Sequence, residues 1–427
     1  KDHRYAFFPS VSAAWRISEE NFWQPLKGWW NDMKIRGSYG SLGNQVMDDL
    51  GNFPYLATYG TNSSYNYLIN GSKPVIVKAP GLVAPDFTWE TVTQMDFGFD
   101  ASFLNNRLTG TFDWYRRNTK DMLVAGATLP ATLGASVPKS NSADMKTIGW
   151  ELSLGWNDRL ENGFSYWVKG VLSDYQTTIT KYAGNDAGFY SQSDGDGKYY
   201  VGQKIGEIWG YHSNGLFQSD DEAATIDQSE LYAGKWGAGD VKYEDLDNDG
   251  KITKGEETIY NPGDKSIIGN KTPRYQFGIT VGFDYKNFDF EMFWQGTGKR
   301  DYMLSGAQFW GFTSQWDVPY TPALDYWTET NTDAYFPRPG WQNGGNRVTS
   351  DRYLQSAAYG RLKNLTVGYT IPKNLTTKWG ISRLRLYVTG ENLLTITPLN
   401  DAFDPETLGG MTYPINRKVA IGLNLTL

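Results

Sequence analysis

Apolar and polar residues alternate one by one along many stretches of the chain. TQMDFGFDASF (93–103) places its apolar residues at every second position, and TIGWELSLGWN (147–157) and RYQFGITVGFDYK (274–286) repeat the pattern. Successive side chains of a β-strand point to opposite faces, so a period of two predicts strands with one apolar face and one polar face. We therefore predict an all-β protein.

The same pattern predicts eleven strands in total. Their approximate bounds are 5–16, 32–42, 88–104, 107–118, 147–157, 164–180, 273–285, 287–299, 354–370, 381–394 and 414–427. Short polar turns alternate with long connections. The long connections lie near 43–87, 119–146, 181–272, 300–353 and 395–413. Antiparallel strands with short turns at one end and long loops at the other are typical of a transmembrane β-barrel of the outer membrane.

A soluble β-sandwich or β-propeller is the alternative, because its strands also alternate. Sandwich strands commonly have about five or six residues, whereas a tilted membrane strand needs about 9–11. Many of the predicted strands reach about ten residues. Strand length therefore favours the barrel, with polar residues on its inner face. These inner residues would include Asp96, Asp100, Glu151, Gln276 and Glu291.

Composition narrows the function further. Aromatic residues make up 15% of the 427 residues, which suits amphipathic strands. The net charge of −7 offers no basic stripe for a nucleic acid. The chain has no Cys and two His, His3 and His212, far apart in sequence. Because no P-loop, nucleophile elbow or paired metal-binding histidine is present either, we do not expect an enzyme.

Longer segments carry a more specific signal. They include MKIRGSYGSLGNQ (33–45), VGQKIGEIWGYHSNGLFQ (201–218), GDVKYEDLDNDGKIT (239–253), AAYGRLKNLTVGYTIP (357–372) and LRLYVTGENLLTIT (384–397). In this order they resemble the C-terminal barrel region of SusC/RagA-type TonB-dependent transporters of Bacteroidetes outer membranes. The sequence departs from that family in showing no plug domain or TonB box, and in ending on Leu427 where the family usually has Phe.

The resemblance implies that residues 1–427 form the C-terminal half of a barrel of about 22 strands. Eleven strands agree with that number. With the long loops extracellular, Lys1 would lie in or near an extracellular loop and Leu427 at the periplasmic rim. Two unpaired sheet edges are unstable in lipid, so we expect a partner carrying the other strands and the plug. The chain would then be a fragment, a cleavage product or one piece of a split barrel.

The segment DLDNDGKITKGE (245–256) has the spacing of a calcium loop. Asp245, Asp247, Asp249, Lys251 (through its carbonyl), Thr253 and Glu256 occupy its six ligand positions. The flanking residues have no helical apolar stripe, so we expect a structural Ca²⁺ ion that orders the large extracellular loop 181–272 rather than a regulatory EF-hand. A metal-free Asp/Gly turn is the alternative. A second Asp/Gly cluster, 194–197, lacks the full spacing, and a solvated loop is expected there.

Aromatic residues in the long loops are candidates for ligand contact, since such rings stack on sugars or line peptide grooves. We name Trp209, Tyr211, Trp310 and Trp316 as candidates. Packing of the loops against one another is the plainer interpretation of the same rings.

The leading hypothesis is nutrient uptake across the outer membrane. By resemblance, the barrel would admit an oligosaccharide or oligopeptide, a SusD-like lipoprotein would cover the extracellular loops, and TonB would act on the plug of the other half. One alternative is a SusC-like barrel that serves as a scaffold in a larger envelope complex. Another is a soluble glycan-active β-protein.

Overall fold

The structure is a computed structural model that describes residues 5–44, 56–62, 68–78, 80–84, 87–125, 130, 132, 134, 137–183, 185, 188, 199–408, 412–413 and 415–427. The predictions that involve Lys1, His3 and 194–197 fall outside these residues.

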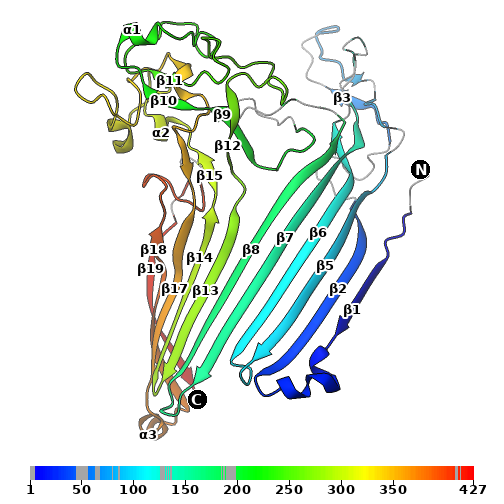
Figure 1. Ribbon diagram of the computed structural model, residues 1–427, viewed down its shortest axis with the longest axis vertical. Coiled ribbons are helices and arrows are strands. Elements are labelled where there is room, and N and C mark those ends of the chain that lie inside the picture. The colour runs from blue at the N-terminus through cyan, green and yellow to red at the C-terminus, as the bar shows by residue number, and fades with distance from the viewer. Residues whose placement is uncertain are drawn as a thin grey trace.

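One antiparallel sheet of 11 strands dominates the molecule, and its strand order follows the chain (Figure 1). The strands are β1 (Ser10–Trp15), β2 (Trp30–Asn44), β5 (Glu90–Phe103), β6 (Leu108–Ala125), β7 (Lys139–Arg159), β8 (Ser165–Tyr182), β13 (Arg274–Tyr285), β14 (Phe288–Lys299), β17 (Tyr359–Thr370), β18 (Arg383–Ile396) and β19 (Lys418–Thr426). All eleven predicted segments contribute a strand to it. The prediction of an all-β antiparallel fold is confirmed.

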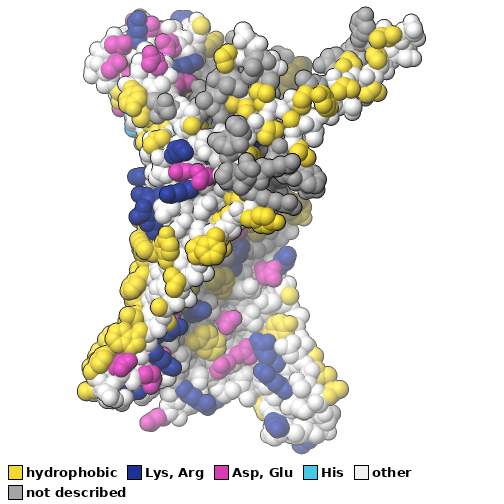
Figure 2. Space-filling model, turned by 90° about the vertical axis from the view of Figure 1, so that its right-hand side faces the viewer, with side chains coloured by type: hydrophobic (Ala, Val, Ile, Leu, Met, Phe, Trp, Pro, Cys, Tyr) yellow, Lys and Arg dark blue, Asp and Glu magenta, His cyan; other side chains and the backbone are white. Residues whose placement is uncertain are grey.

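The register of the strands separates two faces of the sheet. Phe97, Trp114 and Trp150 lie directly opposite one another on β5, β6 and β7, and directly opposed residues point to the same face. The polar face carries the residues predicted for it, Asp96, Asp100, Glu151, Gln276 and Glu291. Figure 2 shows hydrophobic side chains gathered along the left-hand profile of the lower half of the molecule.

Short turns join the strands at one end of the sheet. Between β5 and β6 the chain turns on Leu104, Asn105 and Asn106, which all have positive φ angles, a conformation that Asn adopts more readily than most residues. At the sheet edges, within the described residues, β1 is paired by β2 alone and β19 by β18 alone. The sheet is therefore open along both edges.

Long loops gather at the other end of the sheet and contain short elements of their own (Figure 1). The short strands are β3 (Gly60–Asn62), β4 (Ile76–Lys78), β9 (Glu207–Tyr211), β10 (Ser213–Leu216), β11 (Val241–Tyr243), β12 (Lys265–Asn270), β15 (Asp301–Met303) and β16 (Leu354–Ser356). The helices in these loops are α1 (Asp220–Ala223), α2 (Ala307–Trp310) and the 3-10 turns Thr321–Leu324 and Gly344–Arg347. At the opposite end of the sheet lie α3 (Lys373–Thr376) and the 3-10 turns Ile17–Glu19, Asn21–Leu26 and Thr377–Trp379, in the connections β1–β2 and β17–β18 (Figure 1). None of the helices in the described part of the chain has the length and apolar character needed to cross a membrane.

Three of the long loops, 199–273, 300–358 and 397–408, fold together into one structure, which we name the cap. Their side chains share a hydrophobic core that includes Tyr211, Val241, Tyr243, Ile252, Leu304, Phe309, Trp310, Trp327, Phe336, Tyr353 and Phe403. Phe309 is fully buried and its ring contacts those of Trp310, Phe336 and Tyr353. Burial of large aromatic rings is a strong source of stability, so the cap is a folded unit rather than a set of separate loops.

Four predicted strands differ clearly from the observed ones. β6 continues to Ala125 and β7 begins at Lys139, so both extend into the connection predicted at 119–146. Residues 5–9 precede β1 without forming a strand, and the side chains of Tyr5 and Phe7 are exposed. The predicted strand 354–370 is divided: Leu354–Ser356 pairs with β15 in the cap, the buried Ala357 interrupts it, and β17 begins at Tyr359. Alternation shows that a segment is extended, but it does not show which partner the segment pairs with.

Candidate functional site

The polar face of the sheet carries ion pairs that cross between strands. Arg36 on β2 binds Asp113 on β6, with Nη2 and Oδ2 2.7 Å apart, and its Nε lies 3.3 Å from Asp100. On β17, Arg361 forms ion pairs with Asp404 and Glu406 of the cap, and Lys363 pairs with Glu406. Clefts open on this face, one of about 260 Å³ beside Arg36 and Asp96 and one of about 620 Å³ beside Trp167 and Arg385. Charged side chains from several strands therefore meet on this face.

A separate cavity of about 600 Å³ lies where the upper ends of β6, β7 and β8 meet the cap. Its lining includes Met122, Met145, Ile179 and Tyr182, together with Arg274 and Arg300. Sequence reasoning missed this cavity, because its walls come from strands and loops that are far apart in the chain.

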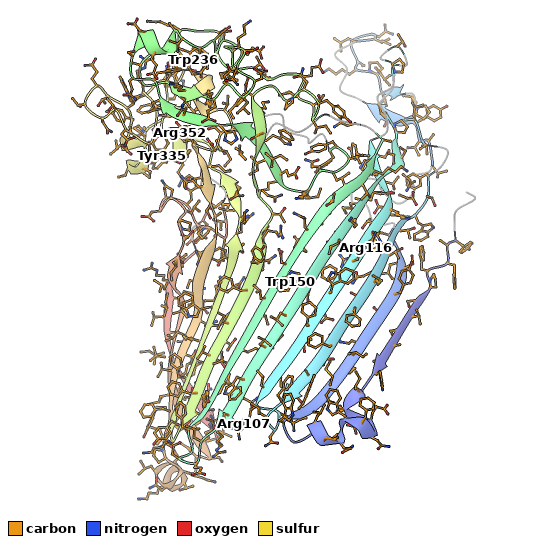
Figure 3. All side chains as sticks on the ribbon, viewed as in Figure 1. Arg107, Arg116, Trp150, Trp236, Tyr335 and Arg352 are labelled. Carbon is orange, nitrogen blue, oxygen red and sulfur yellow. The ribbon has the colours of Figure 1, made fainter. Side chains whose placement is uncertain are left out.

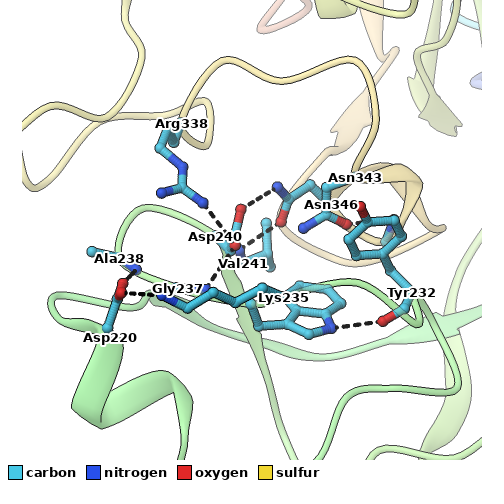
Figure 4. Close-up of polar contacts among 12 residues, drawn as sticks. Asp220, Tyr232, Lys235, Gly237, Ala238, Asp240, Val241, Arg338, Asn343 and Asn346 are labelled. Carbon is cyan, nitrogen blue, oxygen red and sulfur yellow. Dashed lines mark hydrogen bonds and ion pairs between the residues drawn. The ribbon is translucent and has the colours of Figure 1, made fainter.

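Buried polar contacts fix the cap loops to one another (Figure 4). The carboxylate of Asp240 accepts hydrogen bonds from Gly237 N at 2.9 Å, Asn346 Nδ2 at 2.8 Å and Arg338 Nη2 at 3.3 Å. Asn346 Oδ1 accepts a further bond from Val241 N at 2.8 Å. Both Asp240 and Asn346 are almost fully buried. A buried carboxylate is tolerated because its hydrogen-bonding capacity is filled.

His212 belongs to the same structural framework. Its two ring nitrogens lie 2.7 Å from Asp351 Oδ2 and 2.7 Å from Ser266 Oγ. Because its ring nitrogens contact residues of the loops 199–273 and 300–358, His212 links these two loops of the cap.

The predicted calcium loop folds around Asp245. The carboxylate of Asp245 accepts backbone N–H groups from Asn248, Asp249 and Gly250. Partial desolvation raises the pKa of Asp247, and the nearby Asp249 charge adds to this effect. In Asp245 desolvation acts in the same direction, but the hydrogen bonds from Gly250, Asn248 and Asp249 outweigh it and lower its pKa. The loop therefore holds carboxylates close together at an energetic cost.

One acidic group in this region combines two of the predicted ligands with a residue that the spacing does not identify. Ligand oxygens of Asp245, Asp247 and Asp264 lie within 4.8 Å of one another. Asp264 is fully buried, and its two oxygens accept Leu246 N and Thr253 N, both at 2.7 Å. Glu256 is exposed instead, because Gly255 turns the chain and Glu256 N bonds to Asn261 O. Sequence reasoning missed Asp264 because it lies beyond the twelve-residue loop. The ligand role of Glu256 stays a prediction.

The other predicted ligands of that loop remain near it. Lys251 N donates to Asp249 Oδ1 at 2.8 Å, and Thr253 N donates to the buried Asp264. The carbonyl of Thr253 accepts from Tyr211 Oη at 3.3 Å. Carboxylate and carbonyl oxygens are the ligands that Ca²⁺ prefers, so the donor set fits that ion.

The four candidate ligand-binding rings have different surroundings. Tyr211 is 2% exposed and Trp310 is 9% exposed, and both contribute to the core of the cap. Burial raises the pKa of Tyr211, and the negative charge of Asp264 adds to the shift. In this conformation neither ring has an open face. Trp209 is half-buried beside Tyr200, whereas Trp316 is 83% exposed.

An open antiparallel sheet of 11 amphipathic strands, with a folded cap of long loops at one end, is the architecture of a segment of a transmembrane β-barrel. The sequence model of one protein family, the TonB dependent receptor-like β-barrel, matches residues 1–393. The chain belongs to this family. The prediction of a SusC/RagA-type TonB-dependent barrel is confirmed. The alternative of a soluble glycan-active protein does not agree with this result.

Several relatives match the chain over its whole length. TonB-dependent receptor P3 of Formosa agariphila is 30% identical, and the chain covers 42% of that protein. TonB-dependent receptor SusC of Bacteroides thetaiotaomicron is 27% identical, and the chain covers 40% of it. In the solved structure of the RagAB peptide transporter, one chain has the same fold, with a TM-score of 0.76 at 22% identity over 100% of this chain and 44% of that one. The chain thus spans about two fifths of the length of these relatives.

Proposed function

We propose that the chain forms part of the wall of a TonB-dependent transporter that takes up an oligomeric nutrient across a bacterial outer membrane. The observation that carries the proposal is the continuous 11-stranded sheet with an apolar and a charged face. In lipid every backbone polar group needs a partner, so only a closed barrel can span the membrane. The open edges at β1 and β19 therefore require further strands, which we assign to the rest of a barrel of about 22 strands that also holds the plug.

The proposed orientation follows from the two ends of the sheet. Long loops of bacterial outer-membrane barrels are extracellular and short turns periplasmic, so the cap faces outward. Leu427 lies at the end opposite the cap (Figure 1), which is then the periplasmic rim. The apolar face contacts lipid, and the face with Asp96, Glu151 and Gln276 lines the lumen or contacts the plug.

The nutrient in this proposal is an oligosaccharide or an oligopeptide. The similarity to SusC and to the fold of a peptide transporter supports an oligomeric ligand. A SusD-like lipoprotein would cover the cap, and TonB would act through the plug. On the cap, the exposed ring of Trp316 is better placed than Tyr211 or Trp310 to contact a ligand or the lid.

The test is growth of the parent bacterium after deletion of this gene. With oligosaccharides or oligopeptides as the sole nutrient, we expect growth on one oligomer class to be lost while growth on its monomers is unchanged. Collapse of the proton-motive force should abolish uptake of that oligomer in the parent strain. Unchanged growth on every oligomer, together with an altered set of envelope proteins, would contradict transport and favour the scaffold.

We also propose that Asp245, Asp247 and Asp264 bind a structural Ca²⁺ ion, with Asp249 and the carbonyl of Lys251 as further ligands. Three carboxylates within 4.8 Å of one another repel unless a cation or protons compensate them. Calcium would neutralise them and hold the cap segment 245–264 in place. The metal content of the purified, undenatured protein tests this directly, and an absence of calcium after purification in calcium-containing buffer would contradict it.

A further inference from the structure

Four basic side chains gather on the apolar face of the sheet, at the end nearer the cap. Arg116 and Lys120 belong to β6 and Lys146 to β7, while Lys204 lies in a cap segment that bridges to Thr178 of β8. Asn118, Lys146, Thr178 and Lys204 form one cross-strand row, and Arg116, Ile148 and Gln176 form the row below it. Because directly opposed residues share a face, these side chains point to the same side as Trp114 and Trp150. We name Arg116, Lys120, Lys146 and Lys204 the basic row.

The basic row lies directly above the aromatic part of the apolar face. Trp114 and Trp150 stand one same-face position below Arg116 and Ile148, a distance on the order of 7 Å along a strand. Figure 3 shows Arg116 nearer the cap than Trp150, with Arg107 at the far end of the sheet. In Figure 2 a group of lysine and arginine side chains lies above the hydrophobic side chains of the left-hand profile. Aromatic belts mark the membrane–water interface, so the basic row stands at the level of lipid headgroups.

The charges of the basic row have no acidic partner among the described residues. Within the part of the chain that the structure describes, none of its four members forms an ion pair, and Arg116 Nε bonds to the amide of Asn118 at 3.4 Å. Asp174 lies opposite Trp150 on the same face, but it forms an ion pair with Arg274 rather than with a member of the basic row. Arg116, Lys120 and Lys204 are exposed. Four unpaired cations in a chain with a net charge of −7 therefore form a local basic patch.

We propose that the basic row binds the phosphate groups of an anionic lipid in the leaflet on the cap side. Phosphates at this level lie within reach of long Lys and Arg side chains, which extend from an apolar surface toward charged headgroups. Asn118 and Gln176, in the same two rows, supply uncharged donors for the remaining oxygens. The acyl chains of the same lipid would pack on Phe97, Trp114 and Trp150. This proposal rests on the proposed function in one respect: the proposed orientation identifies the leaflet on the cap side as the outer leaflet.

The experiment uses the complete barrel, purified with the strands that close it, in nanodiscs of phosphatidylcholine. Diphosphorylated lipid A is titrated in, and the same lipid with its phosphates removed serves as the matched probe. We expect tight retention of the phosphorylated lipid alone, measured by native mass spectrometry. Each basic residue near a charged surface contributes about fivefold to such binding. The variant R116Q/K120Q/K146Q/K204Q should therefore weaken it by at least tenfold.

The matched control removes basic charges from the opposite face of the same sheet, on β2, β6 and β8. Arg117, Lys34 and Lys169 point to the polar face, and R117Q/K34Q/K169Q should leave lipid binding within about twofold. Equal loss in both variants, or equal binding of the dephosphorylated lipid, would overturn the proposal. Displacement of lipid A by millimolar inorganic phosphate would reassign the basic row to a free anion. Labelling of the cap on intact cells tests the orientation separately, so the two proposals fail independently.

Discussion

Arg36 and Asp113 form an ion pair across a strand that belongs to neither of them. Arg36 lies on β2 and Asp113 on β6, and their atoms Nη1 and Oδ1 are 2.6 Å apart. The strand between them, β5, places Gly98 directly opposite both residues. A Cβ atom on Gly98 would overlap Asp113 Oδ1. Asp289 and Arg385 meet in the same way above Gly368, so glycine allows ion pairs to span three strands of the polar wall.

The substitution Gly98→Ala should therefore destabilise the barrel. The added methyl group forces the Arg36–Asp113 pair apart in a wall that cannot expand, and overpacking of this kind costs about 1–3 kcal/mol. Unfolding of the complete barrel in urea, followed by tryptophan fluorescence in lipid vesicles, measures the change. Gly170→Ala is the matched control, because a Cβ atom there meets open space. Equal stability of the two variants would show that the ion pair is not held by this packing.

A second prediction concerns Asn346 in the cap. The change Asn346→Ala removes one donor to Asp240 and the acceptor of Val241 N, and leaves a buried carboxylate and a buried N–H short of partners. Each unsatisfied buried group costs about 1–3 kcal/mol, so the cap should open while the sheet stays folded. Limited proteolysis measures opening of the cap, and a heat-modifiability gel shows whether the barrel stays folded.

Lys235→Ala is the control for the Asn346 variant. Lys235 bonds to Asp220 at 2.6 Å in the same region, but its side chain is 80% exposed (Figure 4). Exposed ion pairs contribute little. Protease cleavage as rapid in Lys235→Ala as in Asn346→Ala would contradict the assignment of cap stability to the buried pair.

The sheet was predictable from the sequence because its strands carry a local signal. Phe97, Phe99 and Phe103 alternate with Asp96, Gly98 and Asp100, and the two faces of the structure separate at these positions. The cap was not predictable in the same way. Phe309 and Tyr353 of one loop meet Phe403 of another in a single core, and no periodic pattern along the chain predicts this contact.

The candidate sites show the same division. The spacing of Asp245, Asp247 and Asp249 indicates a metal loop without any knowledge of the fold. Asp264 reaches that loop through the pairing of Thr253 and Asp264, whose backbone groups bond at 3.2 Å. Residue type alone does not show that Tyr211 and Trp310 are buried whereas Trp316 is exposed, because burial depends on tertiary packing.

The side-chain capping contacts at the start of α1 predict that the stability of this part of the cap depends on pH. Ser219 Oγ accepts Glu222 N, and the Glu222 carboxylate accepts Gln218 N at 2.7 Å and Lys242 Nζ at 2.9 Å. The bond from Gln218 and then that from Lys242 lower the pKa of Glu222 below its ordinary 4.5. A depressed carboxyl pKa stabilises the folded state above the unfolded value and loses that contribution as the pH falls through the folded value. The stabilisation should thus be complete above pH 4.5 and disappear below it.

The comparison of wild type with Glu222→Gln tests this dependence. The variant should be cleaved faster in the cap at pH 7, and the difference between the two proteins should close as the pH falls below 4.5. Protease-independent hydrogen exchange of residues 218–224 provides the readout at acid pH. Asp221→Asn, at an exposed neighbouring position, should follow wild type at every pH. A difference in hydrogen exchange between wild type and Glu222→Gln that stays constant from pH 7 to pH 3 would be evidence against the titration of Glu222.

Calcium removal should loosen the cap segment 245–264, and Asp264 rather than Glu256 should control the effect. A ligand at 100 times its dissociation constant stabilises the bound state by about 2.7 kcal/mol, so EGTA should speed proteolysis of this segment in wild type. Asp264→Asn removes a carboxylate charge from the group of Asp245 and Asp247, and its cleavage should be rapid with or without calcium. Glu256→Gln changes an exposed residue outside that group and should retain the full response to calcium. The opposite result, a response lost in Glu256→Gln and kept in Asp264→Asn, would restore the twelve-residue ligand set that the spacing alone predicts.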